Sequence, residues 1–185
     1  DNMPFIILYQ SIGIIALIVV VLSFQFKDQK KLLILNATAC TIWAIHFILR
    51  GAYSGVMLNL IAVLRGFGFA FIKNKKWRIA FLSFLVALLI GAGFITVIYF
   101  DEIWYLALIT TIGSTLGTIL FSLNSPKLLR WGQLLCISPA WLFYNIWYLS
   151  IGGIIGESSN MISVLVSFIR FTVQQTKMKK ENASD

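Results

Sequence analysis

Long apolar runs, separated by charged or glycine-rich breaks, dominate this sequence. They are Pro4–Phe24, Leu32–Leu49, Val56–Ile72, Ile79–Phe100, Ile103–Leu123, Trp131–Leu149 and, beginning at about Ser158, Ser158–Val173. A helix needs about 20 mostly apolar residues to cross a bilayer, and these runs are near that length. The strands of a membrane barrel would instead alternate with a period of two over about 10 residues. The pattern therefore predicts an all-α polytopic membrane protein with seven transmembrane helices.

The amino-acid composition excludes several other classes of protein. Hydrophobic residues make up 59% of the 185 residues and charged residues 12%, whereas a soluble domain carries about 25% charged residues. Such a chain is neither a soluble enzyme nor a disordered protein. The net charge of +8 would suggest nucleic acid for a soluble protein, but the basic residues lie in short loops. We expect a lipid bilayer as partner and no nucleic acid.

Basic residues are unevenly divided between the two sets of loops. The segments after the first, third, fifth and seventh runs hold 12 Lys and Arg residues, whereas Arg50 stands alone on the opposite side. Because Lys and Arg accumulate in cytoplasmic loops, the sequence predicts an N-terminus outside and a C-terminus in the cytoplasm. The 12 residues are Lys27, Lys30, Lys31, Lys73, Lys75, Lys76, Arg78, Lys127, Arg130, Lys177, Lys179 and Lys180.

The two parts of the chain resemble each other at a shift near 100 residues. The matches include Trp43 with Trp141, Gly55 with Gly153, and Ile12-Gly13 with Ile112-Gly113. Two parallel three-helix units joined by one extra helix form a known transporter plan. The expected parts are residues 1–72 (first bundle), 73–102 (linker, with the span at 79–100), 103–173 (second bundle) and 174–185 (polar cytoplasmic tail). The linker run has no Asn, Gln, His or charged residue, which suits a helix that faces lipid.

This three-one-three plan resembles the SWEET and PQ-loop superfamily, which also contains the KDEL receptors. The chain is more closely similar to the YgjV-type family of bacterial inner-membrane proteins. The residues that carry this likeness are Gly55, Arg65, Trp141-x-x-x-Asn145, Gly152-Gly153 and Ile169-Arg170-Phe171. Phe24-Gln25 and Leu123-Asn124 stand where PQ-loop proteins have Pro-Gln, and Tyr144 stands where the YgjV pattern has histidine. The resemblance implies a multi-pass protein of the bacterial inner (plasma) membrane.

Ionisable residues are scarce inside the predicted spans. No Asp or Glu lies well inside any span, and Glu157 falls in the polar segment just before the last one. Intramembrane carboxylates commonly carry protons or cations, so we expect facilitated movement rather than cation-driven pumping. His46 is the single histidine, and no nucleophile–base pair or metal cluster can be assembled. We expect no enzyme activity, no cofactor and no metal.

Two arginines lie within predicted spans. Arg65 is near the middle of its span, where an unpaired arginine is unfavourable by about 3 kcal/mol on insertion scales. It either pairs with carbonyl or amide groups inside the bundle or binds an anionic or carbonyl-bearing solute. Arg170 lies about one turn from the cytoplasmic boundary, where its side chain can reach the headgroups, although it shares a polar stripe with Asn160.

Aromatic and polar side chains gather in the second and sixth spans. Trp43 and Trp141 either face each other as the wall of a cavity or anchor the helices at the interface. His46 is either a hydrogen-bonded neutral histidine or a substrate-binding group, and Pro139 should disturb the sixth span. The residues that we expect to bind solute are Gln10, Trp43, His46, Asn59, Arg65, Trp141, Tyr144, Asn145 and Arg170.

These features favour a small transporter or facilitator that moves a small polar or anionic organic solute. A cavity near the midplane would lie between two rocking three-helix bundles. The alternatives are a binding or sorting receptor on the same architecture and a structural membrane protein without transport. A homo-oligomer is compatible with each of these functions.

Overall fold

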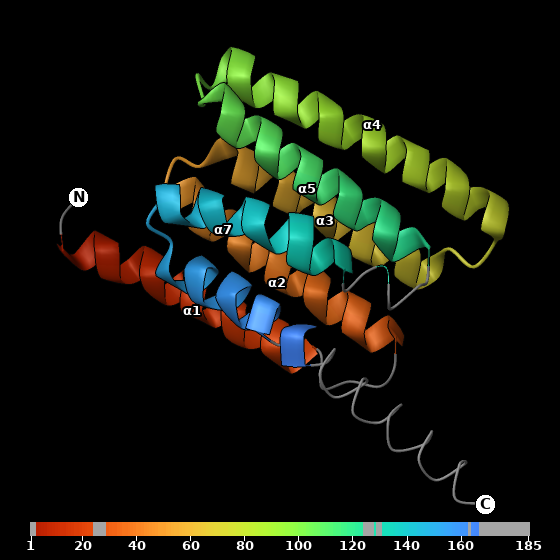
Figure 1. Cartoon of the computed structure of the whole chain (residues 1–185), viewed down its shortest axis with the longest axis horizontal. Coiled ribbons are helices and arrows are strands. Elements are labelled where there is room, and N and C mark those ends of the chain that lie inside the picture. The colour runs from red at the N-terminus through yellow and green to blue at the C-terminus, as the bar shows by residue number, and fades with distance from the viewer. Residues whose placement is uncertain (1–2, 24–28, 124–127, 129–130, 163, 167–185) are drawn as a thin grey trace, which may run out of the picture.

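Helices account for nearly all of the part of the chain that the structure describes, and they lie side by side (Figure 1). The computed structural model describes residues 3–23, 29–123, 128, 131–162 and 164–166. The elements are α1 (Met3–Ser23), α2 (Gln29–Leu49), α3 (Tyr53–Phe71), α4 (Lys75–Tyr99), α5 (Trp104–Ser122), the π-helical turn η1 (Gln133–Ile137) and α7 (Ser138–Trp147). A further helix, Ile151–Val166, follows α7; we call it the C-terminal helix. The described residues contain no strand.

Several of these helices have the length and composition of membrane spans. Four are long and apolar enough to cross a membrane, and they are Met3–Leu22, Tyr53–Phe71, Lys75–Tyr99 and Trp104–Ser122. Two shorter apolar helices are Leu33–Leu49 and Ile151–Val166. The prediction of an all-helical membrane protein is therefore confirmed for the described residues.

The C-terminal helix begins at Ile151, seven residues before the predicted start at Ser158. Ser150 precedes it as N-cap, because its Oγ accepts a 3.3 Å hydrogen bond from the backbone N–H of Gly153, as capping serines do. The following glycines were interpreted as a loop, but they lie in the first turn of the helix. A Cβ atom at Gly152 would come within 2.7 Å of the backbone of Gly13, so glycine permits close packing of the C-terminal helix on α1.

The sixth predicted span departs from α-helical geometry. Residues 131 and 132 are helical, η1 follows as a π-helical turn, and α7 then begins at Ser138. Pro139 has no N–H and cannot donate to the carbonyl four residues earlier. The π turn lies directly before this proline. In it the backbone N–H of Ser138 donates to Gln133 O, five residues earlier instead of four. The predicted disturbance at Pro139 thus takes the form of a π turn.

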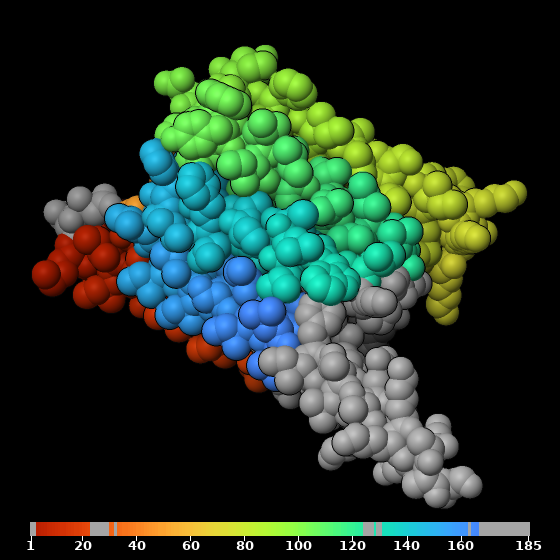
Figure 2. Space-filling view, in the orientation of Figure 1, coloured from red at the N-terminus to blue at the C-terminus, as the bar shows by residue number. Residues whose placement is uncertain are grey.

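The helices surround a central space, and α4 lies outside it. Contacts join α1 to α2, α2 to α3, α3 to α5 and α5 to α7, and the C-terminal helix contacts α7 through Ser138 and Glu157 and α1 through Gly152. Helix α4 packs against α3 and α5 at one edge of the bundle (Figure 1). On the face seen in Figure 2, atoms of α5, α7 and the C-terminal helix succeed one another from green to blue.

Successive helices alternate in direction, so the connections gather at two ends of the bundle (Figure 1). One end carries the turns after α2, α4 and α7, and we call it the Glu102 end. The opposite end carries the start of α2, with Lys30 and Lys31, and the α3–α4 connection, with Lys73 and Lys75. We call it the lysine end.

Two turns at the Glu102 end share one backbone pattern, 98 residues apart. The turn after α2 has a positive φ of 65° at Gly51, and the turn after α7 has 49° at Leu149. The next residue donates its N–H five residues back in both, from Ala52 to Phe47 O and from Ser150 to Asn145 O. A left-handed residue closed by such a bond is a common helix C-terminus.

A buried carboxylate joins three segments at the Glu102 end. Glu102 Oε2 accepts a 2.6 Å hydrogen bond from Ser54 N–H, and Oε1 accepts from the hydroxyls of Tyr144 and Tyr148, each at 2.9 Å. Tyr144 Oη in turn accepts from Gly55 N–H at 2.7 Å. The N-cap residue of α3, Ala52, has no side-chain cap. Glu102 and Tyr144 therefore satisfy the first N–H groups of α3, where negative charge is favourable.

Replacing Glu102 with glutamine should destabilise the Glu102 end. The substitution removes the charge at the start of α3 and directs an amide N–H toward groups that themselves donate. We expect the free energy of unfolding to fall by about 1–3 kcal/mol, measured as a lower melting temperature in detergent. Asp101→Asn is the matched control, because Asp101 is exposed and asparagine tolerates its φ of 51°. Equal melting temperatures for the two variants would contradict the role of Glu102.

Candidate functional site

A pocket of about 610 Å³ lies in the space between the helices. All the described helices except α4 contribute several residues to its wall, and α4 contributes Leu89 alone. The wall includes late α1 residues such as Val21, early α2 residues such as Asn36, and Phe121 near the end of α5. The pocket thus extends toward the lysine end. Its polar and ionisable lining residues are Asn36, Cys40, Asn59, Arg65, Ser114, Thr118, Gln133, Asn145, Glu157, Ser159 and Asn160.

Aromatic side chains separate the pocket from the Glu102 end. Phe47 stacks on Trp43 with ring centroids 5.8 Å apart and on Trp141 at 6.2 Å, and all three residues line the pocket. Tyr144 lies behind them, with its ring edge-to-face against Phe47 and Trp141 at 5.7 Å. Because the Tyr144 hydroxyl reaches Glu102, this aromatic floor is tied to the polar network at that end.

Arg65 brings a positive charge to the wall formed by α3 and α5. Its Nη1 donates a 3.2 Å hydrogen bond to Thr118 Oγ1, and its guanidinium carbon lies 4.8 Å from the centroid of the Phe121 ring. Thr118 directs its own proton to Ser114 O and is therefore an acceptor for Arg65. A guanidinium has five N–H donors. Within the described residues Arg65 makes one hydrogen bond, and its acceptor is the neutral hydroxyl of Thr118. The arrangement suits an anionic or carbonyl-bearing guest.

Glu157 brings an acidic group to the wall formed by α7 and the C-terminal helix. Gln133 Nε2 donates to Ser138 Oγ at 2.8 Å, so the single hydroxyl proton of Ser138 is directed to Glu157 Oε2 at 2.6 Å. Asn160 Nδ2 lies 3.5 Å from the same oxygen. No described residue donates to Oε1, and the half-buried side chain lines the pocket.

This position corrects one expectation from the sequence. Glu157 is the seventh residue of the C-terminal helix, so an acidic residue does lie within an apolar helix. Glu102 lies between two helices, as predicted, but it is buried there with 7% exposure. The preference for movement without a coupled cation relied on the absence of such carboxylates, and it no longer has that basis.

Asn145 presents an unpaired acceptor beside the aromatic floor. Its Nδ2 donates to Trp141 O at 2.7 Å, whereas its buried Oδ1 has no hydrogen-bond partner within the described residues. A Cβ atom at Gly153 would overlap this amide. Gly153 therefore leaves the space that Asn145 occupies, as Gly55 does for Phe47, with which a Cβ atom would clash at 2.7 Å.

The structure brings five of the nine predicted site residues together. Trp43, Asn59, Arg65, Trp141 and Asn145 all line the pocket. They lie on three helices, α2, α3 and α7, and the matched tryptophans were the sequence signal that suggested such a meeting.

Three others lie outside the pocket, in contacts at the Glu102 end. Gln10 Nε2 donates to Leu149 O at 2.8 Å, and its Oε1 accepts from Ile151 N–H at 3.1 Å. His46 is fully buried, with Nδ1 2.7 Å from Tyr9 O and Nε2 2.8 Å from Ser150 Oγ. The carbonyl can only accept, so Nδ1 carries a proton.

These contacts join α1 to the turn after α7. Tyr144, the third residue outside the pocket, belongs to the Glu102 network. Arg170 lies outside the described residues, as do residues 167–185 as a whole, including the predicted tail.

Sequence reasoning missed Glu102 and Glu157 for the same reason. A charged residue between two apolar runs usually indicates a solvated loop, and neither position carries a distinctive motif. For Glu157 a signal was present, because Ser150 directly before an apolar segment is a good helix N-cap. It would have extended the helix to include the glutamate.

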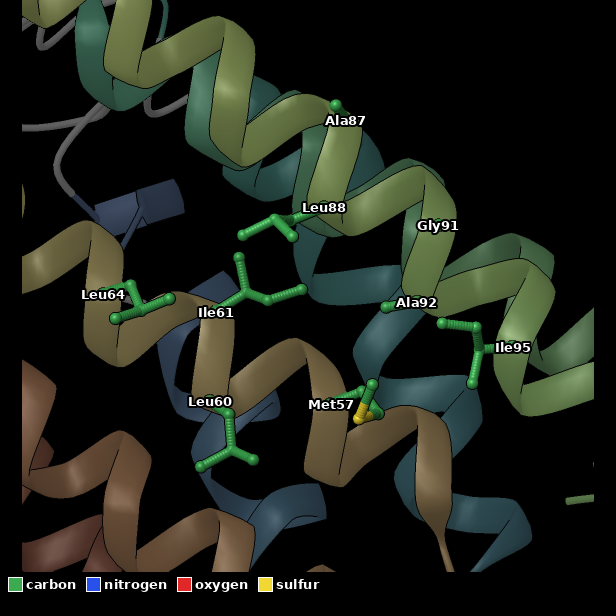
Figure 3. A pocket seen from close by; sticks show the side chains of 9 residues that line it. All are labelled: Met57, Leu60, Ile61, Leu64, Ala87, Leu88, Gly91, Ala92 and Ile95. Carbon is green, nitrogen blue, oxygen red and sulfur yellow. The ribbon is translucent and has the colours of Figure 1, made fainter. Parts of the chain in front are cut away.

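A second, smaller pocket of about 320 Å³ lies between α3 and α4. Figure 3 shows its side chains, among them Met57 and Ile61 from α3 and Leu88 and Ile95 from α4. Every residue that lines it is apolar, and Gly91 leaves open space beside it. It offers no group that could select a polar solute, in contrast to the central pocket.

The helices and the polar central pocket define a polytopic helical membrane protein. The family of bacterial inner membrane proteins called Imp-YgjV matches residues 7–175, and the chain belongs to this family. A search of curated proteins found no match. A search of solved structures likewise found none. The resemblance to the YgjV-type family seen in the sequence is thus confirmed.

Alanine at Gly153 should disturb the pocket and lower stability. The added methyl would overlap the Asn145 amide, and overpacking of this kind reduces the free energy of unfolding by about 1–3 kcal/mol. Melting temperatures in detergent would measure the effect. Gly91→Ala is the matched control, because no atom lies within 4 Å of its added Cβ. A Gly153→Ala variant as stable as Gly91→Ala would show that the Asn145 packing is wrong.

Proposed function

We propose that this protein is a small transporter or facilitator that moves a small polar or anionic organic solute by alternating access. The observation that carries the proposal is the polar central pocket, which is closed at the Glu102 end. Polar and charged side chains line it, and on one side the aromatic floor and the Glu102 network close it.

The two matching turns support a mechanism with two moving units. In our proposal α1–α3 form one three-helix unit, and α5, α7 with η1, and the C-terminal helix form the other. Asn59 and Glu157 are 98 residues apart, like the paired turns, and both line the pocket. A duplicated unit would place equivalent residues on opposite walls in this way. The peripheral helix α4 would then serve as the linker.

The charge pattern supports an orientation for this cycle. We propose that the N-terminus is outside, so the lysine end faces the cytoplasm. The described conformation would then be closed toward the outside by the aromatic floor and the Glu102 network. Opening outward would require the hydrogen bonds between the two units to break, among them those of Ser54 with Glu102, Gly55 with Tyr144 and His46 with Ser150.

No covalent chemistry is part of the proposal, and the protein would not act as an enzyme. Its partners would be a small solute and the bilayer, and it would not bind nucleic acid. The proposal is compatible with a homo-oligomer. A binding or sorting receptor on the same fold is the second candidate, because a pocket closed on one side also suits tight binding without flux. The polar lining argues against a purely structural protein with a dry centre.

Uptake into proteoliposomes tests this function directly. Labelled sugars, carboxylic acids and amino acids serve as probes, and we expect at least one to accumulate faster than in empty liposomes. Arg65→Leu should reduce its uptake about tenfold or more, because a hydrogen bond to a charged group contributes about 1.5–3 kcal/mol. Asn145→Ala should reduce it less, since the amide is uncharged.

Lys75→Gln is the matched control for loss of a positive charge, because Lys75 is exposed at the start of α4. Its uptake should equal that of the unmodified protein. Unchanged uptake in both Arg65→Leu and Asn145→Ala would remove these residues from the mechanism. Binding of a probe without any flux would favour the receptor.

A further inference from the structure

We infer that the central pocket binds a solute that carries both an acidic group and an amine, as an amino acid does. This inference rests on the proposed function and specifies its substrate class. Two oppositely charged side chains line one pocket, Arg65 from α3 and Glu157 from the C-terminal helix. Each retains hydrogen-bonding capacity that the described residues do not use.

At the Arg65 position the pocket offers donors for a carboxylate. The guanidinium is held by the Thr118 hydroxyl on one side and lies over the Phe121 ring. These contacts orient its plane and leave most of its N–H groups without a described acceptor. A planar carboxylate can bind such a fork through two parallel hydrogen bonds.

At the Glu157 position the pocket offers an acceptor for an ammonium group. The chain from Gln133 through Ser138 directs a hydroxyl proton to Oε2, and Asn160 adds a second donor there. Oε2 thereby accepts the hydrogen bonds of these neighbours, and Oε1 is left without a donor among the described residues. An ammonium group has three N–H donors. A charge-assisted hydrogen bond from it to Oε1 would complete the hydrogen bonding of the Glu157 carboxylate.

The two charged groups do not satisfy each other. Within the described residues the hydrogen bonds of Arg65 and Glu157 go to different partners, on α5 for the arginine and on α7 and the C-terminal helix for the glutamate. A charge that is partly withdrawn from water and has no oppositely charged partner is unfavourable. A guest with both charges would compensate both costs at once, whereas a simple anion would leave Glu157 uncompensated.

The rest of the pocket suits the uncharged part of such a solute. Trp43, Phe47 and Trp141 form the aromatic floor, against which an apolar side chain can pack. The volume of about 610 Å³ falls within the range of about 300–1,000 Å³ found for small-molecule sites.

Matched trios of compounds test the inference on the purified full chain. Each trio contains an amino acid, its N-acetyl derivative and its amide, built on alanine, leucine and phenylalanine. The N-acetyl compound lacks the ammonium charge and the amide lacks the carboxylate. Because a ligand raises the melting temperature by mass action, the shift is measured against concentration. We expect at least one parent amino acid to reach a given shift at a concentration at least tenfold lower than either derivative.

Variants test which side chain is responsible for the preference over each derivative. Glu157→Gln should abolish the preference over the N-acetyl derivative and keep the preference over the amide, and Arg65→Gln should do the reverse. Glu157→Asp retains the charge and should retain both preferences. Asp101→Asn and Lys75→Gln, which change exposed charges elsewhere, should behave like the unmodified protein.

The outcomes separate this inference from the proposed transport function. If no trio raises the melting temperature, or if the N-acetyl derivative matches its parent, the inference is overturned. Flux of a sugar or simple acid in proteoliposomes would still support transport in that case. A parent amino acid that binds with the expected preferences, yet never crosses the membrane, would support the inference and overturn transport.

Discussion

The carboxylate of Glu102 is the interaction on which the arrangement of the bundle depends. It satisfies the backbone N–H of Ser54 at the start of α3 and accepts the hydroxyls of Tyr144 and Tyr148 from the end of α7. In an apolar surrounding an unpaired N–H or carboxylate is costly, so each group needs the others. One side chain thereby ties the α4–α5 turn to both walls of the pocket.

The aromatic floor connects the Glu102 network to the pocket. Tyr144 contacts Glu102 through its hydroxyl and Phe47 and Trp141 through its ring. The floor and the polar network therefore form one continuous set of contacts at one end of the molecule. Beyond it, toward the lysine end, Arg65 and Glu157 face a common space. In the transport cycle that we propose, the Glu102 end would act as a gate and this space as the binding site.

Glycines decide how closely the helices approach each other. Gly152 brings the C-terminal helix against the backbone of α1, and Gly153 and Gly55 leave room for Asn145 and Phe47. In lipid no hydrophobic force drives helices together, so small residues that permit close contact become important. The same residues look like loop formers in the sequence, which explains the late start predicted for the last helix.

The length of the apolar runs by itself determined that the chain is helical and belongs in a membrane, because a bilayer imposes the length of each span and the pairing of its backbone. It also singled out Asn59, Arg65 and Asn145, since polar residues in a span usually face the interior of the bundle, and the internal repeat singled out Trp43 and Trp141. Only the tertiary structure decided that Gln10, His46 and Tyr144 make contacts outside the pocket and that Glu157 lines it. The reason is physical: whether a polar side chain binds a neighbour or faces a cavity depends on which helix packs against it, and packing between distant segments is not encoded in local spacing.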